Sequence, residues 1–164
     1  MKTLGIFNDE NVSSENIGLM RRRKAVRAII FDDNKQVAII HSMNNNYYTL
    51  PGGGIEDSES TEEALVRECR EEVGCSVKII DEIGCIQEIR EKKNTINESY
   101  CYTARLVDKS NRDLTADEVT EELEVIWVPV DEGIKLIKSS GNSQNLYHRY
   151  YARRDVAFLK RVRN

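Results

Sequence analysis

The period of apolar and polar positions changes several times along the chain, and each change predicts a strand or a helix. Six short segments are rich in β-branched and aromatic residues or alternate between apolar and polar, so we expect strands. A turn at Asn34-Lys35 joins the first two into a hairpin, and Pro51 with the glycines after it ends the third. The segments are 25–33, 37–43, 47–50, 77–89, 99–107 and 123–130.

A helix is predicted between the third and fourth of these strands. Ser60 and Glu63 have the spacing of a capping box, and Gly74 is a typical helix end. One side of this helix is expected to face the core through Leu65, Val66, Cys69 and Val73. Further helices are expected at 131–138 and 147–162. Strands around a central helix, followed by more helices, favour a mixed α/β or α+β sandwich.

Composition limits the classes of protein that are compatible with this chain. The 164 residues fit one domain, and no repeat or linker divides them, so we expect a single domain at 1–164 with an N-terminal extension at 1–20. The net charge of −4 gives no general attraction to nucleic acid. The first 18 residues lack a signal-peptide pattern, and no apolar run is long enough for a membrane span. The four cysteines form no CxxC pair, which argues against zinc and favours a reduced, cytoplasmic setting.

The densest group of acidic residues lies on the helix that follows the glycines. Glu68, Glu71 and Glu72 are spaced i, i+3 and i+4, so a regular helix presents all three on one face. Their mutual repulsion is unfavourable unless a positive group offsets it. A divalent cation with hard oxygen ligands, such as Mg²⁺, is the natural candidate. A glutamate-rich helix alone is more often a solvated face, but the preceding glycine turn and the separate apolar side favour a metal site.

The spacing around this helix resembles that of the Nudix hydrolase family. Gly53 is followed by five residues and Glu59, then by seven residues and the segment Arg67–Cys75, RECREEVGC. This matches the Nudix box at 53–75, except that two apolar positions are cysteine. The resemblance implies the Nudix fold, a mixed β-sheet sandwiched between α-helices. It also implies Mg²⁺-dependent hydrolysis of a diphosphate linkage, with Mn²⁺ as a second possible cofactor.

The resemblance also implies roles for individual residues. The metal ligands are expected to be Glu68, Glu71 and Glu72, with a backbone carbonyl from Gly52 or Gly53. Catalytic roles fall to Glu68, Glu71 and Arg67, and Glu59 is expected to support Arg67. A later acidic residue often takes part as well, and the candidates are Glu118, Glu121 and Glu122. We favour Glu121 or Glu122, and we take Glu121 as the candidate catalytic residue.

Substrate contacts are expected from the glycines and a tyrosine. The backbone at Gly53 and Gly54 can approach phosphates closely because these residues have no side chain. Tyr47 or Tyr48 could stack on a base, with Tyr48 as our candidate, although strand tyrosines more often pack in the core. His41 is interpreted as structural. The basic residues of the last helix are interpreted as its solvated face, with phosphate or RNA contact as the minority alternative: Arg149, Arg153, Arg154, Lys160, Arg161 and Arg163.

Residues outside the box indicate the substrate only by elimination. The proline typical of ADP-ribose-type members is absent from 89–91, and the tyrosine of dinucleoside-polyphosphate members is absent from 92–94. The leading hypothesis is a (deoxy)nucleoside triphosphate pyrophosphohydrolase of housecleaning type. The alternatives are hydrolysis of ADP-ribose, a nucleotide sugar or an RNA 5′ end, and a sensor domain that binds a nucleotide without turnover. A homodimer is compatible with the resemblance.

Overall fold

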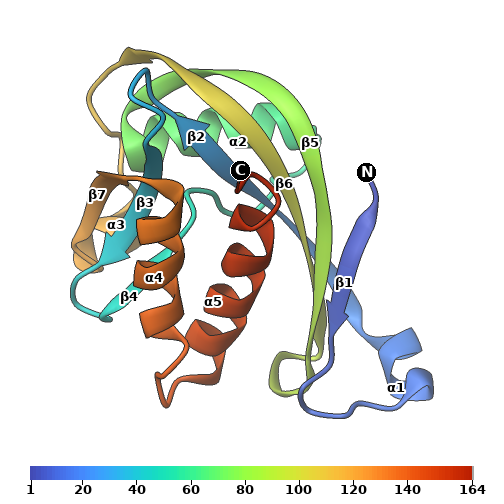
Figure 1. Ribbon diagram of the computed structural model, residues 1–164. Coiled ribbons are helices and arrows are strands. Elements are labelled where there is room, and N and C mark those ends of the chain that lie inside the picture. The colour runs from blue at the N-terminus through green and yellow to red at the C-terminus, as the bar shows by residue number, and fades with distance from the viewer. Residues whose placement is uncertain (164) are drawn as a thin grey trace.

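The computed structural model describes residues 1–163, apart from the side chains at 117 and 118. Its strands are β1 (Thr3–Phe7), β2 (Arg21–Phe31), β3 (Val37–Ser42), β4 (Tyr47–Thr49), β5 (Cys75–Arg90), β6 (Thr95–Lys109) and β7 (Leu123–Val128). Its helices are α1 (Ser14–Leu19), α2 (Thr61–Glu68), α3 (Ala116–Thr120), α4 (Val130–Ser140) and α5 (Leu146–Leu159), with a π-helical turn η1 (Cys69–Val73) and a 3-10 turn η2 (Glu91–Lys93) (Figure 1).

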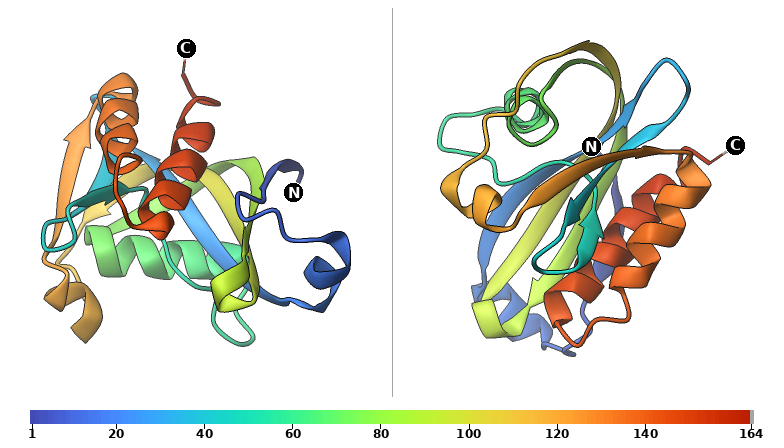
Figure 2. Two further views of the ribbon diagram at one scale, coloured as in Figure 1. Left: turned by 90° about the horizontal axis from the view of Figure 1, so that it is seen from below. Right: turned by 90° about the vertical axis from the view of Figure 1, so that its left-hand side faces the viewer.

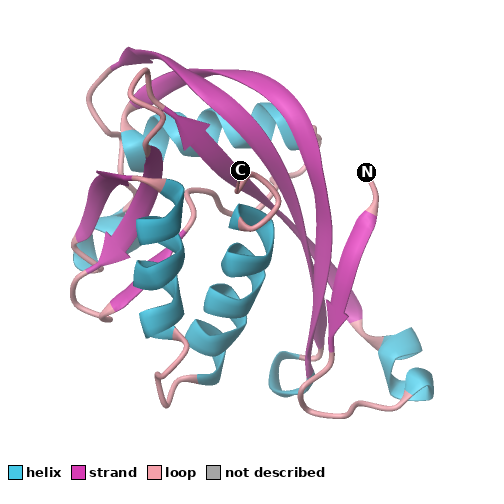
Figure 3. Ribbon diagram, viewed as in Figure 1, coloured by secondary structure: helices cyan, strands magenta, loops and turns pink. Residues whose placement is uncertain are grey.

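The strands of the described chain form one mixed sheet in the order β1-β5-β6-β2-β3-β4, and β7 pairs with β3. The pairs β1–β5 and β2–β6 are parallel, and the others are antiparallel. Helix α2 lies on one side of the sheet, and α4 and α5 lie on the other (Figures 2 and 3). The predicted mixed sheet between helices is therefore confirmed.

Strand β2 supplies apolar side chains to both layers because its residues alternate between the two faces. Val26, Ala28 and Ile30 pack in the cluster that includes Leu65 of α2. Ile29 packs instead with residues of α4 and α5. The sequence pattern placed the start of this strand at residue 25, but β2 begins at Arg21, because its first four residues pair with β6 despite their charge.

The structure contains only part of the predicted hairpin, because β2 and β3 pair through a single pair of residues, Phe31 and Val37. The two strands separate because the glycine-containing loop enters between them. Backbone N–H groups of Val26 and Ala28 donate to the carbonyls of Gly53 and Pro51, each at 2.9 Å. This inserted loop is what brings the predicted site to the middle of the sheet.

The N-terminal extension expected at 1–20 adds regular structure to the sheet. Strand β1 pairs in parallel with β5, and α1 follows it with Ser13 as the N-cap. Val12 and Met20 form a small apolar cluster with Ile89 and Ile96 at the adjoining ends of β5 and β6. The pattern did not predict these elements, because a short edge strand and a single helical turn carry little periodicity.

Helix α5 is attached to the sheet by a buried cluster of charged side chains. The Arg154 guanidinium is fully buried and donates to both carboxylate oxygens of Asp155, at 2.7 and 3.1 Å. Asp155 also accepts hydrogen bonds from the Leu50 N–H at 3.0 Å and the Thr49 hydroxyl at 2.7 Å. Arg154 Nη1 lies 3.8 Å from the Glu88 carboxylate of β5. These contacts join α5 to β4, to the residue after it, and to β5.

Two sequence-based expectations about helix faces are wrong. Arg154 does not belong to a solvated face, because Asp155 and Glu88 compensate its charge inside the protein. Val66 was expected in the core but is 43% exposed, whereas Ala64 and Leu65 are buried. The buried side of α2 is thus rotated relative to the prediction.

No helix of the described residues has the length and apolar character needed to cross a bilayer. The four cysteines are buried with free thiols.

Candidate functional site

The loop that precedes α2 needs glycine where it crosses β2. Gly52 has a φ of +132°, and a Cβ atom there would lie 2.9 Å from the carbonyl carbon of Val26. A Cβ at Gly53 would lie 2.7 Å from Cδ of Glu68. The backbone at Gly53 therefore lies directly against the Glu68 carboxylate, a contact that a side chain would prevent.

Helix α2 begins as the sequence predicts and then widens. The Ser60 hydroxyl accepts from the Glu63 N–H, and the Glu63 carboxylate accepts from the Ser60 N–H at 2.9 Å, so the capping box is confirmed. After Glu68 the chain continues as the π-helical turn η1 and ends at Gly74, whose φ is +68°. Such wider turns are frequent at functional sites.

The π-helical turn changes the expected grouping of carboxylates. The spacing i, i+3, i+4 aligns side chains only in a regular α-helix. Glu71 and Glu72 lie in η1, and Glu68 and Glu71 share Arg67 as a partner, whereas Glu72 accepts from the Gly52 N–H. Among the described residues, no three His, Cys, Asp or Glu side chains come together as a ready-made cation site.

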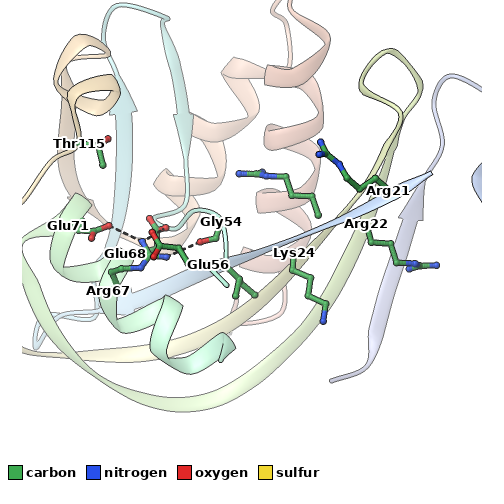
Figure 4. A pocket seen from close by; sticks show the side chains of 11 residues that line it. Arg21, Arg22, Lys24, Gly54, Glu56, Arg67, Glu68, Glu71 and Thr115 are labelled. Carbon is green, nitrogen blue, oxygen red and sulfur yellow. Dashed lines mark hydrogen bonds and ion pairs between the residues drawn. The ribbon is translucent and has the colours of Figure 1, made fainter. Parts of the chain in front are cut away.

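Arg67 is the centre of the site. Its guanidinium binds Glu59 through two hydrogen bonds of 2.9 and 3.0 Å. Its Nη1 atom donates to Glu68 at 2.9 Å and to Glu71 at 3.0 Å. Its Nη2 atom also donates to the Gly54 carbonyl at 2.9 Å. One side chain thus links the loop to two carboxylates of the helix, as shown in Figure 4, and it offsets part of the repulsion for which we expected a cation.

The two sides of this network have different electrostatics. Hydrogen bonds from Arg67 lower the pKa of the Glu59 carboxyl. Burial raises the pKa of the Glu68 carboxyl, and the Arg67 charge limits that increase. The bond to Glu59 contributes most to the raised pKa of Arg67 itself. Glu59 is therefore a fixed partner of Arg67, whereas Glu68 is a carboxylate held in a partly desolvated position.

Glu72 and Gly52 interact with each other. The Gly52 N–H donates to Glu72 Oε2 at 2.7 Å. The Gly52 carbonyl accepts a short hydrogen bond from Arg27 of β2, and the Gly53 carbonyl accepts from Val26. The backbone carbonyls that were predicted as metal ligands thus have protein donors in this structure.

The donors around Arg67 nevertheless fit a hard cation. Mg²⁺ takes one or two carboxylates and keeps several waters, so it does not require a complete protein cage. Glu68 and Glu71 both line a pocket of about 610 Å³. Arg67, which binds both carboxylates, has a side chain that is 24% exposed, and it lines the same pocket. Carboxylate oxygens at a solvent-accessible pocket are chemically suited to Mg²⁺ or Mn²⁺.

Another wall of this pocket is basic, and the predicted site residues do not include it. Arg21, Arg22, Arg23 and Lys24, the first four residues of β2, all line the pocket and are exposed. Figure 4 shows Arg21 pointing to one side of the strand, and Arg22 and Lys24 to the other. Four consecutive basic residues directly before an apolar strand were the available signal.

The two tyrosines of β4 point to opposite sides. Tyr48 stacks on His41, with ring centroids 4.2 Å apart and an interplanar angle of 11°. Tyr47 instead donates from its hydroxyl to Glu121 at 3.0 Å and lies 4.5 Å from the His148 ring. Burial and the Glu121 charge raise the pKa of the Tyr47 phenol. Tyr47 thus contacts α5 through His148 and Tyr151, whereas Tyr48 packs against the apolar cluster formed with α4 and α5.

The downstream acidic candidates are placed differently. The Glu121 carboxylate is partly buried and hydrogen-bonded to Tyr47. Glu122 is exposed and has a φ of +51°. The side chain of Glu118 lies outside the described part of the structure. Of the two described candidates, only Glu121 has a side-chain partner from another element.

Fold and site together define a class: an α+β protein whose glycine loop and helix present carboxylates to an open pocket. A family model of the NUDIX domain matches residues 21–150, and the chain belongs to this family. The match covers the loop, α2 and both walls of the pocket.

Curated relatives match over a shorter stretch. The chain is 40% identical over 63 residues to an RNA pyrophosphohydrolase of Ectopseudomonas mendocina (strain ymp), covering 38% of this chain and 40% of the relative. It is 43% identical over 63 residues to an ADP-ribose pyrophosphatase of Methanocaldococcus jannaschii, covering 37% of each. It is 34% identical over 59 residues to a putative 8-oxo-dGTP diphosphatase of Bacillus subtilis (strain 168), covering 36% and 40%. The matches thus span about two-fifths of these relatives.

Solved structures share the fold. A NUDIX hydrolase from Nitrosomonas europaea has a TM-score of 0.62 at 18% identity, covering 82% of this chain and 88% of the other. A UDP-X diphosphatase has a TM-score of 0.60 at 17% identity, covering 93% and 71%. At this level of identity the likeness concerns the fold.

Proposed function

We propose that this protein is a metal-dependent hydrolase that cleaves a diphosphate linkage in a nucleoside diphosphate derivative. The observation that carries the proposal is the Arg67 network, which holds Glu68 and Glu71 at the wall of a pocket. Carboxylates held by a neighbouring guanidinium keep a defined orientation, which metal-ligating side chains require. Family membership supports the same reaction class.

Each residue then has a chemical task. Glu68 and Glu71 would hold Mg²⁺ or Mn²⁺, and Glu72, which accepts from the Gly52 N–H, completes the predicted set of ligands. When bound, the cation neutralises phosphate charge and acidifies a water molecule. Arg67 orients the carboxylates, and Glu59 holds Arg67 in place. Gly53 keeps the loop close to Glu68, because no side chain separates them.

The proposal also assigns roles to a downstream acidic residue, to the backbone of the glycine loop and to a tyrosine. Glu121 serves as the downstream acidic residue, held by Tyr47. The backbone at Gly53 and Gly54 approaches the substrate phosphates. The predicted Gly52 carbonyl ligand requires that Arg27 release it. The base-stacking role proposed for Tyr48 requires that the ring leave His41, and the Tyr47 ring is likewise in contact with His148 and Tyr151.

The leading substrate is a (deoxy)nucleoside triphosphate. The relatives named above differ in the substrates that their names give, so family membership alone does not choose among them. ADP-ribose, a nucleotide sugar and an RNA 5′ end are the alternatives within the enzyme class, and a cytoplasmic location and a homodimer are compatible with it. A non-catalytic sensor is less favoured, because it has no need for the carboxylates that surround Arg67.

A substrate panel with Mg²⁺ tests the proposal. It includes canonical and oxidised (d)NTPs, ADP-ribose, nucleotide sugars, dinucleoside polyphosphates and a 5′-triphosphate RNA, each with and without chelator. We expect Glu68→Gln to lower turnover by at least about 100-fold, as loss of a catalytic carboxylate typically does. Glu62→Gln is the matched control, because Glu62 is exposed on the same helix and does not contact Arg67.

The outcomes separate the two classes of function. Turnover that requires the metal and is lost in Glu68→Gln, but not in Glu62→Gln, supports the hydrolase. Binding of a nucleotide without turnover of any compound supports the sensor. Full activity of Glu68→Gln would show that the carboxylate assignment is wrong.

A further inference from the structure

Three arginines lie on one face of β2 and lead away from the carboxylates. Arg27 donates to the Gly52 carbonyl, next to Glu72. Arg23 lies against the loop, where its Nη2 atom is 3.1 Å from the position of a Cβ on Gly54. Arg21 follows at the open end of the strand. Side chains two residues apart on a strand are roughly 6.6 Å apart, so Arg23 and Arg21 continue the line that Arg27 begins.

The two outer arginines have unused hydrogen-bonding capacity. Arg23 makes one side-chain hydrogen bond, to Asn97 at 3.3 Å, although a guanidinium has five N–H donors. Within the described part of the protein, the Arg21 side chain has no hydrogen-bond or ion-pair partner. Arg22 differs, because it points to the other side and binds Glu98. Both outer arginines line the pocket that contains Glu68 and Glu71.

Protection of a free strand edge is the simpler explanation for basic residues at this position. The edge of β2 opposite β6 is open before Lys24, where the loop begins to cover it through the Ile55 N–H. Charged side chains at such an edge discourage pairing with other chains. Edge protection is a sufficient explanation for Arg22 and Lys24. It does not account for Arg23, which is held against Gly54 while Arg67 binds the carbonyl of the same glycine.

The charges of the pocket therefore specify a ligand with two anionic parts. The wall with Glu68 and Glu71 suits a diphosphate only through a cation. The wall with Arg21 and Arg23 suits a phosphate directly, because guanidinium groups match phosphate oxygens in geometry and charge. A nucleotide sugar carries no anionic group beyond its diphosphate, whereas a triphosphate carries a third phosphate.

We propose that Arg21 and Arg23 form a binding site for the phosphate beyond the scissile diphosphate, and that they select a nucleoside 5′-triphosphate over a nucleotide sugar. The proposal rests on the proposed hydrolase function and adds the residues that determine its substrate class. The triphosphate can belong to a free nucleotide or to the 5′ end of an RNA, and both present the same group to the two arginines.

Binding of inorganic polyphosphates to the 164-residue protein tests this site independently of hydrolytic activity. Tripolyphosphate and pyrophosphate are titrated by calorimetry, in chelator and in Mg²⁺. We expect tripolyphosphate to bind the wild type more tightly than pyrophosphate in both buffers. The double variant Arg21→Gln/Arg23→Gln should lose about tenfold in tripolyphosphate affinity, the effect of two exposed ionic contacts. Its affinity should also depend less on salt.

The matched control is Lys78→Gln/Arg105→Gln. These residues are exposed register partners on β5 and β6, they do not line the pocket, and their replacement changes the net charge equally. The control should keep the preference for tripolyphosphate. An equal loss in both double variants would mean a general charge effect, and an unchanged preference in Arg21→Gln/Arg23→Gln would mean that these arginines do not bind phosphate. Either result overturns the proposal.

Kinetics then separate this proposal from the proposed function. With Mg²⁺, the double variant should lower the ratio of kcat/KM for a triphosphate to that for a nucleotide sugar, mainly through KM. The loss of kcat/KM in the double variant is compared for a free triphosphate and a 5′-triphosphate RNA. The substrate with the larger loss is the one that depends more on the two arginines. If no compound is hydrolysed but the tripolyphosphate preference depends on Arg21 and Arg23, the hydrolase proposal fails and the phosphate site stands. If hydrolysis occurs and the ratio does not change, the phosphate site fails alone.

Discussion

Arg67 and Arg154 each bind carboxylates, but they do so in opposite surroundings. Arg67 lies at the wall of a pocket with its side chain 24% exposed, and it links the loop to Glu68 and Glu71. Arg154 is fully buried in α5, where it binds the adjacent Asp155 and lies 3.8 Å from the Glu88 carboxylate of β5. The same ionic chemistry thus orients side chains toward solvent in one region and attaches a helix to the sheet in the other. Solvent access, not the type of contact, separates the two roles.

The largest effect is expected from removing the buried arginine. Arg154→Met leaves Asp155 without the guanidinium that binds both of its carboxylate oxygens, and it leaves Arg90 as the remaining ion-pair partner of Glu88. Breaking a buried pair from one side typically costs about 3–5 kcal/mol of unfolding free energy. Urea denaturation measures the loss. Arg153→Met is the control, since Arg153 is exposed and its ion pair with Asp9 is expected to contribute less than about 1 kcal/mol. Equal losses in both variants would contradict the structural role assigned to Arg154.

A smaller effect, on activity more than on stability, is expected at Arg67. Arg67→Lys keeps the charge but cannot bind Glu59 with two N–H groups while also reaching Glu68 and Glu71. Loss of such a supporting contact typically lowers metal affinity or activity about 10- to 100-fold. Steady-state kinetics at several Mg²⁺ concentrations would measure this, with the exposed neighbour Arg70→Lys as control. If Arg67→Lys unfolded in urea as easily as Arg154→Met, the contrast between the two arginines would be lost.

The smallest expected effect concerns pH. Burial lowers the pKa of the His148 imidazole, and the nearby Glu121 opposes this shift. The unfolded chain, with an ordinary histidine pKa near 6.5, binds the proton more readily than the folded protein. This contribution to stability is therefore present above pH 6.5 and decreases as the pH falls through the folded pKa.

His148 lies beside Tyr47 and Tyr151 on the side of α5, whereas no described histidine lies in the Arg67 network. The melting temperature should fall between pH 7.5 and 5.5 by slightly more in the wild type than in His148→Gln. Differential scanning calorimetry over this range provides the measurement. Parallel curves for the two proteins would show that His148 does not contribute.

Local signals predicted the start of the site well. The capping box at Ser60 and Glu63 depends only on residues that are three apart, and the structure contains both of its hydrogen bonds. The spacing from Gly53 to Gly74 identified the loop and the helix, and family membership confirms that resemblance. Signals of this kind can be read from the chain because the interacting groups are close in sequence.

The orientation of individual side chains was harder to predict. Tyr47 and Tyr48 are adjacent residues of the same type, so the sequence does not distinguish them. Only the pairing of β4 with β3 places Tyr48 opposite His41, on which it stacks. Glu68 and Glu71 bind Arg67, whereas Glu72, in the π-helical turn η1, accepts from the Gly52 N–H. Both outcomes depend on contacts between segments that are distant in sequence.

The sequence by itself determined the reaction class that we propose, through a glycine turn, a capped helix and glutamates at set spacings. It also determined the strands, because alternation and β-branched residues act locally. Only the tertiary structure decided which charges are buried and which line the pocket. Arg154 and Arg23 look alike in the chain, but α5 buries the first between two carboxylates, whereas the open end of β2 leaves the second beside the loop. Burial is a property of the assembled layers, so no local pattern could distinguish them.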